Sequence, residues 1–272
     1  MRAWYEKAVF YHIYPLGLLG APKENFSPDK EPVCPAPLRN LEPWIPHMKE
    51  LGCNALYIGP LFESSTHGYD TRDYRLVDRR LGTNEDFRRF VKLCHEAGIQ
   101  VVVDGVFNHT GREFFAFRSL QENREDSPYS SWYRNVQFHT GSPLGDSFCY
   151  DCWQGHFSLP CLNLSNPEVK TYLFDTVRFW IEQFDIDGIR LDCANVLDMS
   201  FMQELREKTA AMKPEFWLMG EVIHGEYGRW VNLQMLHSVT NYELHKALYS
   251  GHNDHNYFEI AHNVRRLEAG GT

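Results

Sequence analysis

Residues 186–192 of this 272-residue chain read IDGIRLD, an apolar run of strand length that ends on ionisable side chains. Two further stretches have the same form: residues 101–109 read VVVDGVFNH, and residues 216–224 read FWLMGEVIH. In a parallel α/β barrel, side chains at the carboxyl ends of the strands face the active site. The ionisable residues of these three stretches are therefore candidates for one common site: Asp104, His109, Arg190, Asp192, Glu221 and His224.

Strand patterns and amphipathic helix patterns alternate along the rest of the chain. We expect six strands, at residues 9–14, 55–58, 101–103, 186–191, 216–220 and 238–241. Helix patterns lie between the strands, and a last helix is expected at about residues 257–267. One helix is expected to bury a face formed by Leu41, Ile45, Met48 and Leu51. Three other helices are expected to begin at a cap: Asn84, Asn166 followed by Pro167, and Ser200 with Gln203 as a capping box. This alternation predicts an α/β fold with a parallel sheet, and its even rhythm favours a barrel over an open sheet.

The rhythm is interrupted once, between residues 110 and 166. This segment is polar and aromatic, shows little periodicity, and is longer than a βαβ connection needs. We therefore divide the chain into a first barrel part with strands one to three (residues 1–109), an inserted subdomain (residues 110–166) and a second barrel part with strands four to six (residues 167–272).

The composition is that of a folded protein whose partner is not an anion. Hydrophobic residues make up 43% of the chain, and 27 basic against 36 acidic residues give a net charge of −9. This balance argues against nucleic acid or an anionic membrane as the main partner. No segment reaches the roughly 20 apolar residues of a membrane helix, and the start lacks a signal-peptide pattern. We expect a soluble cytoplasmic protein, and a homo-oligomer is left open.

The seven cysteines are scattered and odd in number, which does not favour a disulfide framework. Cys149 and Cys152 form a C-x-x-C pattern with His156 and Cys161 nearby. This pattern has two interpretations, a zinc or redox site and reduced cysteines in a loop-rich insertion. We favour the second, because no second paired motif follows.

Asp192 and Glu221 are expected at the ends of neighbouring strands, whose backbones lie about 4.8 Å apart. Carboxyl groups held about 5 Å apart suit a retaining glycosidase, whereas an inverting glycosidase needs room for a water. Arg190 lies two residues before Asp192, so it points to the same face of the strand and can keep Asp192 ionised. Asp192 is thus predicted to be the nucleophile and Glu221 the proton-holding acid/base. A structural Asp–Arg pair is the alternative, which explains neither Glu221 nor His109.

Four motifs in this order resemble the α-amylase family of glycoside hydrolases: HGYDTRDYRLVDRRLGT (residues 67–83), DGVFNH (104–109), GIRLDCANV (188–196) and GEVIH (220–224). The resemblance covers nearly the whole chain and is nearest to the neopullulanases and cyclomaltodextrinases. It implies a TIM (β/α)8-type barrel with a subdomain after strand three. It also implies a double-displacement reaction on α-glucan oligosaccharides or polysaccharides, such as maltodextrins and cyclodextrins.

The resemblance also assigns roles to residues by position. Asp192 is the nucleophile and Glu221 the acid/base. The substrate-binding set surrounds them, with Tyr69 stacking on the sugar and Asp104 bracing Arg190: Tyr69, Asp104, His109, Arg190 and His224. Asn108 is a candidate calcium ligand, and no other cofactor is implied.

The sequence departs from the family pattern in two places. Cys161 stands where neopullulanases carry a lysine, so the preference among maltodextrin, cyclodextrin and pullulan stays open. The family's third carboxylate follows strand seven, but strands seven and eight are expected to be missing from this chain, and residues 252–254 (HND) are interpreted as a loop. We therefore expect little or no hydrolysis by this chain alone. The alternatives are a transglycosylase or isomerase of the same family, and a non-catalytic truncated barrel that binds glucans.

Overall fold

A computed structural model describes residues 3–27 and 34–269, and its centre is a sheet of six strands. The strands follow the order β1-β2-β5-β8-β9-β10, and every neighbouring pair is parallel. Their bounds are β1 (Phe10–Ile13), β2 (Ala55–Ile58), β5 (Gln100–Gly105), β8 (Gly188–Leu191), β9 (Trp217–Gly220) and β10 (Ser238–Val239). All six predicted strands are present. The predicted α/β architecture is confirmed as six strands of a TIM-type barrel wall.

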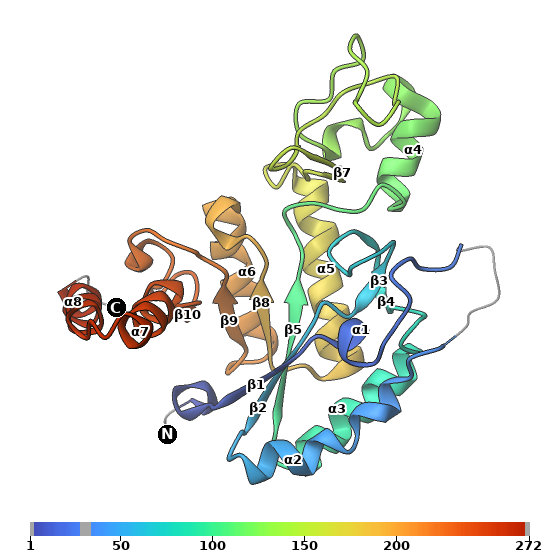
Figure 1. Ribbon diagram of the computed structural model, residues 1–272. Coiled ribbons are helices and arrows are strands. Elements are labelled where there is room, and N and C mark those ends of the chain that lie inside the picture. Colours follow the sequence, from blue (N-terminus) through green and yellow to red (C-terminus); the bar gives the residue numbers. More distant parts are fainter. Residues whose placement is uncertain (1–2, 28–33, 270–272) are drawn as a thin grey trace.

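Helices connect the strands, as a parallel sheet requires. The main connecting helices are α2 (Trp44–Glu50), α3 (Asn84–Glu96), α5 (Pro167–Phe184) and α6 (Met199–Met212). Two helices that contact each other, α7 (Tyr242–Asn253) and α8 (Phe258–Ala269), follow β10 at the edge of the sheet (Figure 1). A short helical turn, η1 (Trp4–Lys7), precedes β1, and others lie in the connections: α1 (Pro15–Leu18), η2 (Leu38–Leu41), η5 (Ala194–Val196) and η6 (Tyr227–Arg229).

Aromatic contacts show that the sheet curves. The rings of Phe10 in β1 and Trp217 in β9 stack with their centroids 4.7 Å apart, although three strands separate β1 from β9 in the sheet. On the helix side, Trp180 of α5 stacks between Phe62 and Phe107, with centroid distances of 4.3 and 5.8 Å. Each such side chain contributes about 1.5–3 kcal/mol by leaving water. Rings therefore fill both the concave side of the wall and the layer under α5.

An antiparallel hairpin, β3 (Phe62–Ser64) and β4 (Thr71–Val77), joins β2 to α3 and is not predicted from the sequence. Its alternation is hidden because a charged residue, Glu63, occupies a buried position and pairs with Arg79 at 2.7 Å. The turn after the hairpin holds a second ion pair, between Asp78 and Arg80 at 2.7 Å, and both side chains are fully buried. The loop that carries Tyr69 is closed by Asp70, which accepts hydrogen bonds from the backbone nitrogen and the hydroxyl of Thr66.

Residues 110–166 lie beyond the carboxyl end of β5, in the upper part of Figure 1. They contain α4 (Phe115–Asn123), η3 (Arg124–Asp126), η4 (Ser130–Trp132) and a hairpin of β6 (Cys152–Trp153) and β7 (His156–Pro160). Asp146 organises this segment: burial raises its pKa, but hydrogen bonds from Arg112, Ser142 and Gln121 outweigh burial and lower the pKa to about 2. The division into three parts stays a prediction.

Two predicted helix starts are wrong, and one is confirmed. The N-cap of α3 is Thr83, which exchanges hydrogen bonds with Asp86, while the Asn84 side chain bonds to the backbone of β4. The N-cap of α6 is Asp198, which accepts from the backbone of Phe201, so no capping box forms at residues 200–203. In both cases the capping residue stands one or two positions earlier than predicted. The predicted start of α5, with its asparagine cap and proline at residues 166–167, is confirmed.

Helix α7 is not predicted, and it changes the interpretation of residues 252–254. His252 and Asn253 form the last turn of this helix and Asp254 is its C-cap, so the HND segment is not a loop. On α2, Leu51 is 57% exposed and does not share the buried face. None of the helices in the described part of the chain is long and apolar enough to cross a bilayer.

Candidate active site

The register of the sheet brings the predicted strand ends together. Asp104 of β5 lies opposite Arg190 of β8, and Leu191 lies opposite Gly220. Parallel pairing continues one residue further, because the backbone nitrogen of Glu221 donates to the carbonyl oxygen of Leu191 at 2.9 Å. Asp192 and Glu221 therefore extend from neighbouring strand ends at the same edge of the sheet.

Arg190 is the centre of this group. One terminal nitrogen contacts Asp104 Oδ1 at 2.7 Å and Asp192 Oδ1 at 3.0 Å, and the other contacts Glu221 Oε2 at 2.8 Å. Burial lowers the pKa of Arg190, but the charges around it, that of Asp104 first, outweigh burial and raise the pKa. The guanidinium stays charged, and one cation holds three acidic side chains.

Asp192 titrates at a higher pH than the sequence suggests. Burial, supported by the charge of Asp104, raises its pKa to about 6, although Arg190 acts in the opposite direction. From the sequence we expect Arg190 to be the larger influence and to lower the pKa of Asp192. Desolvation outweighs it because Asp192 is only 6% exposed. At pH 7 Asp192 is still mainly ionised, since its pKa lies about one unit lower.

His109 is buried and neutral. It is 2% exposed, and burial lowers its pKa to about 4. Its Nδ1 lies 3.2 Å from Asn108 Nδ2, whereas its Nε2 is buried with no hydrogen-bond partner in residues 3–27 and 34–269. Such an atom calls for a partner from a bound molecule.

The structure brings Tyr69 to this group but not His224. Burial, followed by the negative charge of Asp104, raises the pKa of Tyr69, and Asp192 and Glu221 add to the effect, so the half-buried phenol stays neutral. His224 is exposed in the loop after β9, and within the described residues no hydrogen bond or ion pair links it to the three carboxyl groups.

Two aromatic residues of this site were missed from the sequence. Tyr57 donates a hydrogen bond to Asp104 Oδ2 at 2.6 Å, and the ring of His12 stacks on Tyr57 with a centroid distance of 4.3 Å. Both stand inside apolar strands, opposite each other in the β1–β2 register. A polar residue within an apolar strand was the available signal.

Cys193 and Tyr242 were also missed. Cys193 contacts both carboxyl groups: its Sγ lies 2.9 Å from Asp192 Oδ2, and its backbone nitrogen donates to Glu221 Oε2 at 3.2 Å. The hydroxyl of Tyr242, on the unpredicted helix α7, donates to Glu221 Oε1 at 3.0 Å. Neither contact can be predicted from the local sequence pattern.

The sequence offers two candidate metal sites, and both stay predictions. All seven cysteines are free, and Cys149 and Cys152 belong to no group of three potential metal ligands in the described ranges. The amide of Asn108 contacts His109 and, at 3.8 Å, Cys161 Sγ. Calcium prefers six to eight oxygen ligands. Calcium at Asn108 stays a prediction.

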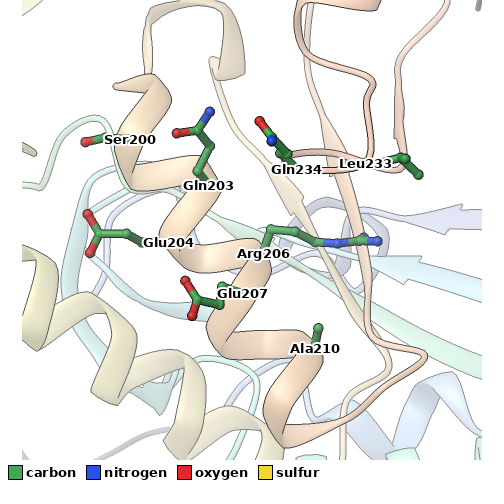
Figure 2. Close-up of a pocket in the computed structure, with 8 residues that line it drawn as sticks. All are labelled: Ser200, Gln203, Glu204, Arg206, Glu207, Ala210, Leu233 and Gln234. Carbon is green, nitrogen blue, oxygen red and sulfur yellow. The ribbon is translucent and has the colours of Figure 1, made fainter.

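A hollow of about 640 Å³ lies away from the strand ends, between α6 and the loop before β10. Figure 2 shows Gln203, Glu204, Arg206 and Glu207 on α6, with Leu233 and Gln234 on the loop. None of the residues predicted for the site lines it. One of its acidic side chains, Glu204, is paired with Lys170 at 2.6 Å. We therefore do not take this hollow as the active site.

Carboxyl groups at neighbouring strand ends, held by one arginine over a parallel barrel wall, define a class of barrel protein whose site lies at the carboxyl ends of the strands. The profile described as alpha amylase, catalytic domain, matches residues 41–268. The chain belongs to the α-amylase family.

Relatives support the predicted subgroup. A cyclomaltodextrinase of Thermoanaerobacter pseudethanolicus is 35% identical over 258 residues, covering 90% of this chain and 44% of the relative. Neopullulanase 2 of Thermoactinomyces vulgaris is 36% identical over 251 residues, covering 88% and 42%. The structure of the cyclic α-maltosyl-(1→6)-maltose hydrolase of Arthrobacter globiformis in complex with maltose aligns with a TM-score of 0.86 at 29% identity, covering 99% of this chain and 63% of the other. The chain thus spans less than half the length of these two curated relatives.

Proposed function

We propose that this chain carries the catalytic pair of a retaining glycoside hydrolase that acts on α-glucans, with Asp192 as nucleophile and Glu221 as acid/base. The proposal rests on one observation, that both carboxyl groups contact the terminal nitrogens of the Arg190 guanidinium. The two groups extend from neighbouring strand ends, whose backbones lie about 4.8 Å apart, and such a spacing suits a retaining glycosidase. Relatives named cyclomaltodextrinase and neopullulanase support α-glucans as the substrate class.

In the proposed reaction, an oxygen of Asp192 attacks the anomeric carbon while the bond to the leaving sugar breaks. Glu221 gives its proton to the leaving oxygen and then takes a proton from the water that displaces Asp192. Arg190 keeps Asp192 oriented. Asp104 accepts from the same terminal nitrogen of Arg190, and Tyr57 donates a hydrogen bond to Asp104. Two inversions at one carbon leave the configuration unchanged.

The remaining polar groups suit a neutral sugar. The unpartnered Nε2 of His109 can exchange a hydrogen bond with a sugar hydroxyl, because the buried ring is neutral at pH 7. The neutral ring of Tyr69 offers a face for stacking close to the carboxyl groups. No step is routed through calcium.

The test separates the two carboxyl roles with two substrates. α-Glucosyl fluoride has a leaving group that needs no proton, whereas maltoheptaose needs one. We expect Asp192→Asn to abolish fluoride release and maltoheptaose cleavage. Glu221→Gln should abolish maltoheptaose cleavage but keep the first release of fluoride, one ion per chain, because only the second step needs Glu221 as a base. Glu226→Gln, an exposed acid in the same loop, is the matched control and should match the parent chain.

Because only six strands of the wall are described, we expect slow turnover and choose a readout that does not depend on rate. A slowly hydrolysed 5-fluoro-α-glucosyl fluoride should leave one glucosyl adduct on Asp192, located by peptide mass spectrometry. An adduct on another residue, or fluoride release unaffected by Asp192→Asn, would refute the assignment. Product analysis with maltoheptaose, β-cyclodextrin and pullulan distinguishes hydrolysis from transfer.

A further inference from the structure

Three different metal-ligating side chains meet beside the proposed catalytic pair. His109, Asp192 and Cys193 each offer one ligand atom, and these atoms all lie within 4.8 Å of one another. The three residues are buried, at 2%, 6% and 7% exposure. In the described residues this is the one group of three or more histidine, cysteine or acidic side chains close enough to share an ion.

The histidine has a ring nitrogen open to a ligand, which the proposed function gives to a sugar hydroxyl and which a metal ion can take when no sugar is bound. Its Nε2 is buried without a hydrogen-bond partner in the described part of the chain, while its Nδ1 faces the amide of Asn108. Coordination through Nε2 requires the proton on Nδ1, which needs an acceptor. Half a turn of the Asn108 amide puts its oxygen there, at the cost of the long contact with Cys161.

The charge balance also suits a cation. Arg190 contacts three carboxyl groups, so the cluster carries a net charge of −2 when all of them are ionised. A divalent ion would offset the excess without moving Arg190, which contacts Asp192 through Oδ1, whereas Cys193 contacts Oδ2.

We propose that His109, Asp192 and Cys193 form a binding site for zinc, and that zinc bound there blocks the nucleophile. Nitrogen, sulfur and carboxylate ligands select zinc over calcium or magnesium. In a tetrahedral site, neighbouring ligand atoms lie about 3.3–3.8 Å apart, as zinc–ligand bonds of about 2.0–2.3 Å require. Side-chain movements of about 1 Å close the present group to that size.

The binding step exchanges a proton for the ion. The Cys193 thiol now donates a hydrogen bond to Asp192 Oδ2 and so carries its proton in this structure. When a zinc–sulfur bond forms, the thiol proton leaves for the solvent, and Asp192 Oδ2 exchanges that hydrogen bond for the metal. About one proton is released per ion, and binding tightens as the pH rises.

Binding is measured on the full 272-residue chain without any turnover. Cobalt(II) replaces zinc as a probe, because a cobalt–thiolate bond gives a charge-transfer absorption band that zinc then abolishes by displacement. We expect one cobalt ion per chain with this band, and about one proton released per zinc ion in calorimetry performed in two buffers.

Variants locate the site. Cys193→Ser and His109→Gln should each weaken zinc binding by more than about 100-fold, since even outer-shell partners change affinity by about 10–100-fold. Cys193→Ala is the second variant if Cys193→Ser does not fold, and circular dichroism checks both. Cys152→Ser, in the C-x-x-C segment, is the matched control and should bind zinc like the parent chain.

Each alternative outcome overturns the proposal. Absence of a thiolate band, equal binding by Cys193→Ser, or loss of binding in Cys152→Ser would each place the ion elsewhere or nowhere. The blocking effect rests on the proposed function, and it is read separately: zinc should suppress fluoride release from α-glucosyl fluoride in the parent chain, and Cys193→Ala should resist zinc in proportion to its lost affinity. Zinc binding without inhibition would refute only the claim that bound zinc blocks the nucleophile.

Discussion

Replacing Arg190 by Met should destabilise the chain strongly, because it removes the only cation found in contact with the three carboxyl groups among the described residues. Methionine keeps much of the apolar stem, so the change removes charge and hydrogen bonds more than volume. Asp104 and Asp192, at 2% and 6% exposure, cannot turn to water for compensation.

The magnitude follows from the contact distances. At 2.7–3.0 Å, each contact contributes about 6 kcal/mol of attraction with an effective dielectric constant of about 20. Repulsion among the carboxylates and the desolvation of Arg190 offset most of this. Removal of one partner from a buried ionic group typically costs about 3–5 kcal/mol, and we expect a loss of that size near pH 7.5.

The loss should depend on pH in a defined direction. In the parent chain Asp192 has a pKa of about 6, raised above its ordinary 3.8, so the folded state holds this proton more tightly and stability falls as the pH rises between these values. Without Arg190 the carboxyl pKa values rise further, and the folded variant takes up protons at higher pH. The difference in unfolding free energy between variant and parent should therefore shrink as the pH falls to about 5.

Urea unfolding followed by circular dichroism, at about pH 7.5 and about pH 5, measures both effects. The matched control is Arg178→Met, because Arg178 pairs with Asp175 at 2.9 Å but both side chains are about half exposed. Such a surface pair contributes about 0–1 kcal/mol. If Arg190→Met costs no more than Arg178→Met near pH 7.5, or if its cost grows on acidification, the electrostatic reasoning is refuted.

Three other predictions concern the parts that support the site. Asp78→Ala leaves Arg80 charged in a fully buried position, so urea unfolding should show a loss of about 3–5 kcal/mol, and a loss below about 1 kcal/mol would contradict this. The pKa of Asp146 is lowered to about 2, so its stabilising effect is present above about pH 4 and lost as the pH falls towards 2. The melting temperatures of Asp146→Asn and the parent should therefore converge on acidification, and a constant gap would count against it. In Gly59→Ala the new Cβ would lie 2.7 Å from the Cβ of Asp104. Displacement of the Asp104 side chain should lower the free energy of unfolding by about 1–3 kcal/mol and slow fluoride release. Fluoride release at the parent rate would contradict this displacement.

The sequence alone determined the parallel wall and the positions of its ionisable ends. The apolar runs at residues 101–103, 186–191 and 216–220 predict strands of a buried sheet. Side chains alternate along a strand, so Arg190 and Asp192 lie on one face. Helix caps were less secure, because Thr83 and Asp198 compete with neighbours of similar chemistry and the local pattern does not rank them.

Only the tertiary structure decided which charged groups pair with one another and how far each is desolvated. Position in the sequence shows that Arg190 precedes Asp192, but not that the same guanidinium also holds Asp104 and Glu221, or that desolvation outweighs it at Asp192. Contacts between distant segments, such as that of Tyr242 with Glu221, leave no periodic trace in the chain. Periodicity records which face of an element is buried, whereas desolvation and unpartnered atoms, such as Nε2 of His109, depend on what the rest of the fold places against that face.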